Sequence, residues 1–324
     1  LNAAGMAALP IAFQADSCDG AWGALQLIGT SARGLIEHAE MTYAQGITGG
    51  RGAVVASQGA QVVLRDCVMA DLLCAGIAAR DGATRIEVYD TAIERAAGGV
   101  VCDAASALLD RVRIADLPGA SIGIHLLDES DPPSEIRDCV LDTGIDTGIL
   151  LEGASARIEG ASVHGTTGSG LRATGACAPA IARTLIWGCR DGLALENGAS
   201  ASLTRCTIAA NAVGLYLRET EPGAGGPQAA ADSLIVWGNG ITVLIDPYST
   251  LAIEWSDIEG GYDGTNNLSF DPLFVDAAGG DFRLQPMSPA IGAGKDGADM
   301  GALPSIAAGE APFMRGDANA DGRT

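Results

Sequence analysis

The sequence is poor in basic and aromatic residues, and these shortages exclude several classes of protein. It has 19 basic against 40 acidic side chains, a formal net charge of −21 and 4% aromatic residues, and Lys295 is its only lysine. A nucleic-acid-binding protein needs a basic stripe to displace phosphate counterions, and an anionic membrane surface also attracts basic residues. No apolar run reaches the roughly 18 residues that span a bilayer. We therefore expect neither a nucleic-acid partner nor membrane insertion.

Common catalytic and cofactor motifs are also missing. The chain has no phosphate-binding glycine loop and no Ser-His-Asp signature. Its histidines, His38, His125 and His164, do not share metal-ligand spacing. The chain is nevertheless 48% apolar, so it can bury a core and is not a disordered polymer. We expect a folded protein whose main domain requires no cofactor.

The cysteines do not form a recognisable disulfide framework. None of the eight lies in a Cys-x-x-Cys pair, and no two share a position in adjacent repeats of the pattern described next. The pattern favours buried, reduced cysteines that fill space in the core. One or two disulfide bridges are the alternative.

A repeat of about 23 residues runs through the chain. A glycine followed by apolar, variable and apolar residues recurs at intervals of 22 to 26. Alternation of this kind is typical of a strand with one buried face. The glycines are Gly52, Gly76, Gly99, Gly123, Gly148, Gly170, Gly192, Gly214 and Gly240.

A second short strand is predicted about a dozen residues after each glycine. Its apolar column is followed by a column of small residues that suits a stacked interior. No helical period competes, and the phrase typical of leucine-rich repeats is absent. The sequence therefore predicts an all-β parallel solenoid of about ten coils. The small column comprises Cys67, Thr91, Val112, Cys139, Ala161, Thr184 and Cys206.

The repeat resembles the right-handed parallel β-helix of the pectate-lyase-like superfamily over roughly residues 20–303. The stretch Ala21–Leu27 resembles the entry coil of secreted members. The segments 237–239, 257–261, 271–276, 281–284, 288–291 and 299–302 resemble the C-terminal part of bacterial surface-anchored β-helix proteins. Because this part breaks the repeat and carries phenylalanines and prolines, we expect a C-terminal cap that closes the open edge of the last coil.

The last residues predict a separate module. Residues 1–303 form the β-helix with its cap, 304–312 read as a linker, and 313–324 as the start of a calcium loop. Asp317, Asn319 and Asp321, followed by Gly322, occupy positions 1, 3, 5 and 6 of an EF-hand-type loop. This resembles the beginning of a type I dockerin, which implies a cohesin-type scaffold as partner. The ligand at position 12 is missing, so Ca²⁺ is expected only for the complete loop; an acidic glycine-rich tail is the alternative.

One outward face stands out as a candidate site. Two and four residues after the repeat glycines, five successive coils present His125, Leu150, Arg172, Ala194 and Tyr216, and Leu127, Glu152, Thr174, Glu196 and Arg218. Two inserts, 128–133 and 219–228, leave the same edge and are expected to wall a groove there. An outward position carries no chemistry by itself, since charges on successive rungs also pair with each other.

Two chemistries are open for this face. Glu152 and Glu196 lie two rungs apart, roughly 9.6 Å, near the upper limit for inverting glycoside hydrolysis. In that hypothesis Glu196 is the acid, Glu152 the base, and Arg172 clamps a uronate or sulfate. His125, Tyr216 and Arg218 would bind the sugar. A lyase would need an arginine such as Arg172 as its base.

The resemblance also weighs against catalysis. The Asn-Thr-Asp, Asp-Asp, Gly-His-Gly and Arg-Ile-Lys phrases of polygalacturonase-like members are absent. We therefore expect a secreted or cell-surface protein that engages polysaccharide, either as a glycoside hydrolase or polysaccharide lyase, or as a non-catalytic adhesion or structural module displayed through a dockerin. We expect the export signal upstream of Leu1 and a monomer, because a capped solenoid has no free edge. Trp187 and Trp237, each before a glycine, serve either to pack a corner or to stack on sugars.

Overall fold

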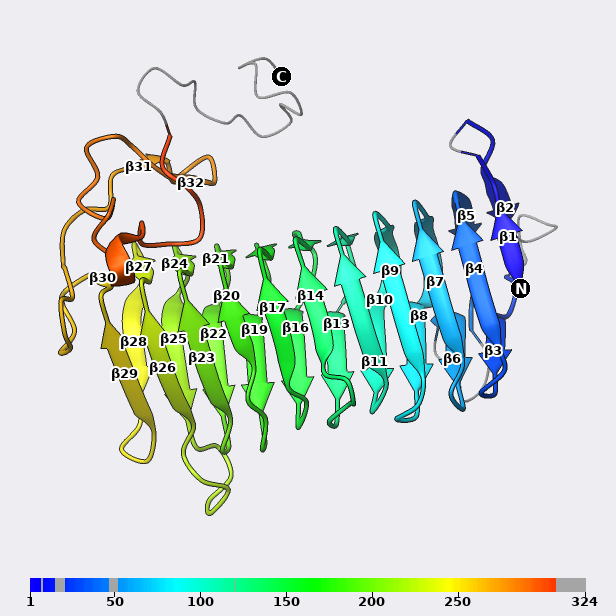
Figure 1. The fold of residues 1–324 in the computed structure, drawn as a ribbon, viewed down its shortest axis with the longest axis horizontal. Coiled ribbons are helices and arrows are strands. Elements are labelled where there is room, and N and C mark those ends of the chain that lie inside the picture. Colours follow the sequence, from blue (N-terminus) through cyan, green and yellow to red (C-terminus); the bar gives the residue numbers. More distant parts are fainter. Residues whose placement is uncertain (7, 15–20, 47–51, 120, 307–324) are drawn as a thin grey trace.

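The computed structural model describes residues 1–6, 8–14, 21–46, 52–119 and 121–306. The chain winds as a parallel β-solenoid whose coils stack along the long axis of the molecule (Figure 1). Within the described residues the only helical element is one short 3₁₀ turn, η1 (Lys295–Gly297). The predicted all-β solenoid is confirmed.

The first sheet has eleven parallel strands, in keeping with about ten coils. It faces the viewer in Figure 1. Its strands are β1 (Asn2–Ala4), β4 (Arg33–Glu37), β7 (Gln61–Arg65), β9 (Arg85–Tyr89), β11 (Ser106–Asp110), β14 (Ser134–Arg137), β17 (Ala156–Glu159), β20 (Ala180–Ala182), β23 (Ser200–Thr204), β26 (Gln228–Asp232) and β29 (Thr250–Glu254).

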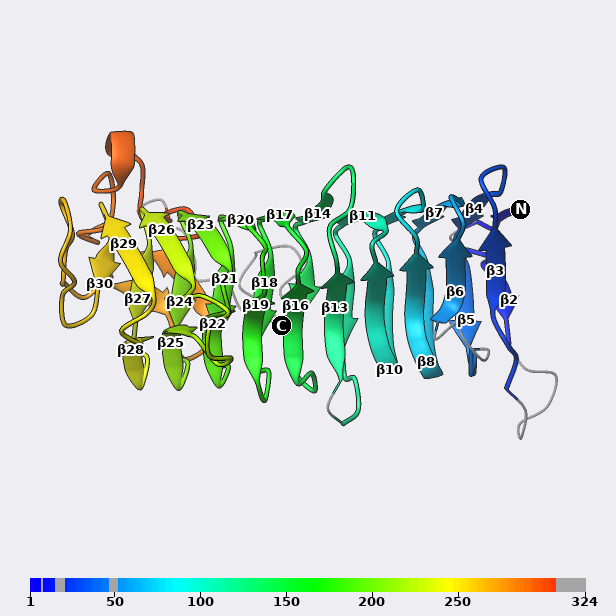
Figure 2. The ribbon, with the colours of Figure 1, turned by 90° about the horizontal axis from the view of Figure 1, so that it is seen from below.

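The second sheet carries the repeat glycines and is visible in Figure 2. Its strands are β3 (Leu25–Ile28), β6 (Gly52–Ser57), β8 (Val68–Arg80), β10 (Ala92–Asp103), β13 (Ile122–Leu127), β16 (Thr147–Glu152), β19 (Ser169–Thr174), β22 (Asp191–Glu196), β25 (Val213–Arg218) and β28 (Ile241–Ile245).

A ladder of short strands joins the two sheets at one corner, and we call it the corner ladder. The long strands β8 and β10 contribute to both the ladder and the second sheet. Its other members are β2 (Ile11–Phe13), β5 (Ala39–Thr42), β12 (Arg113–Ala115), β15 (Val140–Leu141), β18 (Ser162–His164), β21 (Leu185–Trp187), β24 (Thr207–Ala209), β27 (Ile235–Trp237) and β30 (Asp257–Ile258).

The core is one continuous cluster of apolar side chains that stack in columns from coil to coil. From Gly76 to Gly214 the residue after each repeat glycine lies directly above its equivalent in the next coil, as in the register of Ile149 with Leu171 and of Leu171 with Leu193. All three are fully buried. The register differs from the predicted one at Gly52 and Gly240, where Val54 pairs with Ile77 and Ile241 with Val213. The glycines are needed because the backbone bends inward there: a Cβ on Gly148 would lie 2.4 Å from the carbonyl oxygen of Gly170.

The column of small residues follows a turn made by a left-handed residue. Asp66, Asp138 and Arg205 have φ near +50°, and the next residue in each case is a buried cysteine. Each of these thiols donates to the carbonyl two residues earlier, as Cys67 does to Arg65 at 3.2 Å. Seven cysteines are described, and all are buried and unbridged, which agrees with the space-filling interpretation. Cys18 lies outside the described residues.

The last coil is closed by an end loop, residues 259–268, which lies along the outer edge of β29. The Tyr262 hydroxyl donates to Leu251 O at 3.3 Å, and the Asn267 side chain donates to Ile253 O at 2.9 Å. Two carbonyl groups at the edge of β29 are thereby hydrogen-bonded by the end loop.

The rest of the C-terminal part, residues 269–306, is placed differently from the predicted cap. We call this segment the flank cap. It contains the antiparallel hairpin β31 (Phe274–Asp276) and β32 (Asp281–Leu284), and it lies over β21, β24 and β27 rather than over the open edge alone (Figure 1, orange). Phe282 packs on Leu185, and Met300 on Ile235. These corner positions are apolar and point outward, so they require a cover.

The predicted boundaries of the C-terminal part can be compared with these contacts. Ser305 donates to Asp299 at 3.1 Å, and the amide of Ile306 donates to Leu284 O at 3.0 Å. The flank cap therefore continues through the first residues of the predicted linker 304–312. Residues 307–324, including the predicted calcium ligands Asp317, Asn319 and Asp321, lie outside the described residues.

Candidate functional site

The candidate face lies on the outer side of strands β13, β16, β19, β22 and β25 of the second sheet (Figure 2). The register is the one that the repeat predicts. His125 pairs with Leu150, Leu150 with Arg172, Arg172 with Ala194 and Ala194 with Tyr216. The second column aligns Leu127, Glu152, Thr174, Glu196 and Arg218 in the same way.

A hollow of about 280 Å³ lies at the downstream end of this face. Three predicted site residues, Arg172, Glu196 and Tyr216, line it together. The remaining lining residues are Ser169, Arg190, Asp191, Val213 and Leu244.

An ion pair forms the floor of the hollow. Arg172 donates through Nε at 3.0 Å and through Nη2 at 2.6 Å to Oε2 of Glu196. The Glu196 side chain is 8% exposed and that of Arg172 is 43% exposed. A buried carboxylate that accepts two charge-assisted hydrogen bonds fixes the guanidinium plane. Glu196 therefore positions Arg172, whose exposed part faces solvent at the hollow.

A second pair lies upstream of the hollow and does not line it. His125 Nε2 lies 2.5 Å from Oε2 of Glu152. The Glu152 side chain is 45% exposed, whereas that of His125 is mostly buried. Glu152 and Glu196 thus have separate partners, and only Glu196 lines this hollow.

The downstream rim is formed by a tyrosine and an arginine. Arg218 donates to the Tyr216 hydroxyl at 3.2 Å. Tyr216 lines the hollow, while Arg218 lies at its edge on the next outward column. Of the six residues predicted for catalysis or sugar binding, the structure thus brings three into one hollow and leaves His125, Glu152 and Arg218 around it.

Sequence reasoning missed a third outward column, which contributes Asp191 and Ser169. Arg190 donates to Asp191 through Nε and Nη2, at 3.1 and 2.9 Å. The Asp191 carboxylate accepts these bonds and raises the pKa of Arg190. The signal that could have revealed it is the residue before each repeat glycine, which is polar in three successive coils: Thr147, Ser169 and Asp191.

The two inserts do not wall the hollow, because none of its lining residues comes from them. Each insert is instead held by its neighbouring coil. Ser155 donates to Glu129 at 2.6 Å in the first insert. In the second, Asn197 Oδ1 accepts the amide protons of Thr220 and Glu221 at 2.8 and 3.0 Å. The inserts therefore do not contribute to this hollow in the way that we expected for a groove.

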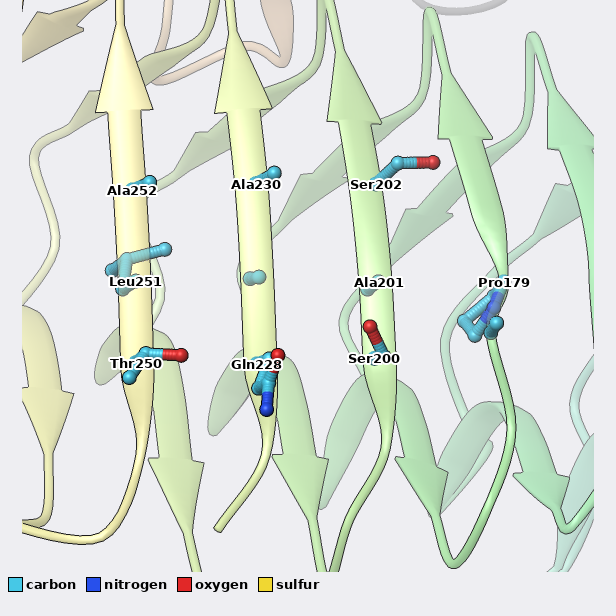
Figure 3. A pocket seen from close by; sticks show the side chains of 11 residues that line it. Pro179, Ser200, Ala201, Ser202, Gln228, Ala230, Thr250, Leu251 and Ala252 are labelled. Carbon is cyan, nitrogen blue, oxygen red and sulfur yellow. The ribbon is translucent and has the colours of Figure 1, made fainter.

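A larger hollow of about 530 Å³ lies on the first sheet, over strands β23, β26 and β29 and residues 178–179 just before β20. Figure 3 shows that short side chains of Ser200, Ser202, Ala230 and Ala252 and the methyl and hydroxyl of Thr250 line it. No charged side chain lines this surface.

The described part of the chain contains no cluster of three or more histidine, cysteine or carboxylate side chains that could hold a metal ion. None of its helical segments has the length and apolar character of a bilayer-spanning helix. Trp187 stacks on His164 with ring centroids 4.8 Å apart and approaches Phe282 at 5.4 Å, and Trp237 packs in the flank-cap cluster. Both tryptophans therefore pack the corner instead of offering sugar platforms.

Comparison with known proteins agrees with this architecture. Residues 98–224 match the family model described as a right handed beta helix region. No curated protein matches the sequence. The fold is a right-handed parallel β-helix.

Two solved structures are similar in fold. The periplasmic alginate epimerase AlgG superposes with a TM-score of 0.62 at 13% identity, covering 79% of this chain and 64% of the epimerase. The chain thus spans less than two thirds of the epimerase. The pectate lyase Pel9A superposes with a TM-score of 0.55 at 12% identity, covering 92% of this chain and 86% of the lyase. At these identities the similarity establishes the fold only.

Proposed function

We propose that the protein binds a polysaccharide chain along the second-sheet face, with the hollow at Arg172, Glu196 and Tyr216 as the main contact. The observation that carries this proposal is the exposed Arg172 guanidinium held rigid by a buried carboxylate. Arg172 Nη1 makes no hydrogen bond to another described residue, so it retains donors for a ligand. A preorganised guanidinium suits a uronate or sulfate group.

The rest of the hollow suits a sugar. Tyr216 offers an aromatic face and a hydroxyl, and Ser169 and Asp191 offer polar groups beside it. Val213 and Leu244 supply an apolar side to the same hollow. Mixed polar and apolar lining of this kind matches the two faces of a pyranose ring. The two fold neighbours are an alginate epimerase and a pectate lyase, which supports a polysaccharide ligand by analogy.

Catalysis is the second candidate, and one observation favours it. The half-exposed Glu152 lies beside His125, an arrangement used for proton transfer. The two-carboxylate hydrolase is harder to support, because Oε2 of Glu196 accepts both bonds from Arg172, whereas a general acid must present its proton to the glycosidic oxygen. Binding without cleavage is therefore our conclusion.

The location of the protein is part of the same proposal. The fold neighbour AlgG is periplasmic, which supports a site of action outside the cytoplasm. Display on a cohesin-bearing scaffold remains a prediction from residues 313–324. A calcium titration of a chain that contains the complete loop would test it.

Binding is tested on the intact chain with a glycan array, followed by calorimetry on the best acidic oligosaccharide. We expect Arg172→Ala to weaken binding at least tenfold, since a charge-assisted pair contributes about 1.5–3 kcal/mol. The matched control is Ser202→Ala, on the other sheet, which should bind like the wild type. Equal affinity of Arg172→Ala and wild type would refute the assignment.

Cleavage is tested on the same oligosaccharides by reducing-end release and by the absorbance of unsaturated products. Turnover that is lost in both Glu152→Gln and Glu196→Gln would establish the hydrolase. No turnover by the wild type, with binding retained, supports a non-catalytic module.

A further inference from the structure

Asp257 is a carboxylate with no exposed surface at the junction of the last coil and the flank cap. It begins β30, where it pairs with Ile235 of the corner ladder and is bridged to Leu268. Ile235 and Leu268 pack in an apolar cluster with Leu284 and Met300 of the flank cap. The carboxyl therefore faces apolar neighbours on both sides of the junction.

Only one of its two oxygens is satisfied. Oδ1 accepts the amide proton of Phe270 at 3.1 Å. Oδ2 is fully buried and has no hydrogen-bond partner. An ionised carboxylate in that position loses its hydration without compensation, whereas a protonated carboxyl is far less costly to bury.

The charges around it do not offset this cost. The one ionisable group that acts on Asp257 is Asp271, another carboxyl. Burial raises the pKa of Asp257 from 3.8 to about 6; Asp271 adds to the increase, and the Phe270 amide opposes it. The main cause is desolvation, which disfavours the charged form.

We propose that Asp257 is a proton-operated latch that tightens the flank cap against the solenoid in acid and loosens it near neutral pH. The protonated carboxyl is compatible with the apolar junction, and the ionised one favours an open cap in which water reaches it. Opening uncovers the outward apolar side chains of β21, β24 and β27, including Leu185, Ala209 and Ile235.

The pH window follows from linkage. The carboxyl binds its proton more tightly when the cap is closed, so the closed state gains stability as the pH falls from about 6 towards about 4. Above the folded-state pKa the closed state gains nothing further from this group. The direction is opposite to that of a salt-bridged carboxylate, which loses stability in acid.

Hydrogen exchange of the full chain reads out the latch. The amides of Gly301 and Ala302 donate to Ser233 O at 2.8 Å and to Thr207 Oγ1 at 2.9 Å, across the junction. We expect their protection factors, corrected for intrinsic exchange, to rise up to about 30-fold between pH 6 and pH 4. In Asp257→Asn this rise should disappear, and protection at pH 7 should exceed that of the wild type.

Two further variants make the outcome decisive. Asp257→Ser also lacks a titratable group, so the rise must disappear in it whatever its absolute protection. Asp263→Asn removes an exposed acid of the neighbouring end loop and should keep the full wild-type rise. A rise that persists in Asp257→Asn or Asp257→Ser, or protection in the wild type that falls on acidification, overturns the latch. Glycan binding plays no part in this readout.

Discussion

Two outer faces of one solenoid carry hollows of different size and different chemistry. The first-sheet hollow is about 530 Å³ and is lined by uncharged side chains, most of them short, whereas the second-sheet hollow is about 280 Å³ and holds two arginines and two carboxylates. Both rest on the same buried core. The two hollows therefore differ in more than size: the smaller one, where we propose that the ligand binds, holds a charged group kept in place by a buried partner.

The first-sheet hollow has a simple origin. Its central outward column changes from long to short side chains along the solenoid, with Glu135 and Arg157 aligned upstream of Ala180, Ser202 and Ala230. Because the outward side chains are long upstream and short downstream, the sheet surface is recessed downstream. We call this first-sheet hollow the shelf. The shelf thus results from missing side chain volume, whereas the second-sheet hollow contains groups with binding capacity.

The largest predicted effect tests whether the two faces share one core. Leu193 lies beneath the second-sheet hollow and Leu203 beneath the first-sheet shelf, and both are buried. Leu193→Ala and Leu203→Ala should each lower the free energy of unfolding by about 2–5 kcal/mol, because each deletes buried methyl groups and leaves a cavity. Urea unfolding followed by circular dichroism measures this.

The control for these two variants is their glycan affinity, measured at a urea concentration well below the unfolding transition. Leu193→Ala should disturb the strand that carries Glu196, and Leu203→Ala should not. If only one of the two variants lost stability, the faces would belong to separate cores and the comparison would fail.

A smaller effect is expected from removing an arginine–carboxylate pair that lies on an exposed surface. Arg111 donates through Nε to Oδ1 of Asp90 at 2.7 Å and through Nη2 to Oδ2 at 2.8 Å, whereas Arg172 gives both of its bonds to one oxygen of Glu196. These bonds from Arg111 lower the pKa of Asp90 below 3.8. Arg111→Ala should raise that pKa towards 3.8, which a carboxyl NMR titration measures.

The stability effect of Arg111→Ala follows with its sign. A depressed folded-state pKa means that the pair stabilises the protein above the ordinary carboxyl pKa and loses its effect as the pH falls through the lowered value. Wild type and variant should therefore differ slightly at pH 7 and converge in acid. The loss of stability in Arg111→Ala at pH 7 should be smaller than the loss of stability in Arg172→Ala, since exposed pairs are screened by solvent. An equal or larger loss in Arg111→Ala would contradict the role given to burial.

The repeat columns were readable from the sequence because side-chain alternation and coil stacking are local and periodic. The glycine spacing predicted the strands, and the register that places Arg172 over Ala194 follows from counting. The sequence did not show which outward side chains pair with each other. Glu152 could have paired with any neighbour within a rung, and its partner His125 depends on side-chain rotamers.

The C-terminal part was harder to predict from the sequence, for a different reason. Its turns and short strands have no period, so the sequence predicted a cap without its position. The outward apolar residues Leu185 and Ile235 on the corner ladder were the available signal for a flank cap, because such positions cannot remain exposed. The buried Asp257 could not be recognised, since burial there comes from a segment more than ten residues further along the chain.

The smallest predicted effect concerns filling the first-sheet shelf. Ala230 is an exposed residue at its centre (Figure 3), and Ala230→Gln places a long neutral side chain in the hollow without breaking any hydrogen bond. Surface substitutions of this kind change stability by about 0.5 kcal/mol or less. We expect glycan affinity within twofold of the wild type by calorimetry, since the proposed binding site lies on the other sheet. A marked loss of affinity in Ala230→Gln, with Arg172→Ala unaffected, would move the binding site to the larger hollow and reverse the conclusion drawn from the two faces.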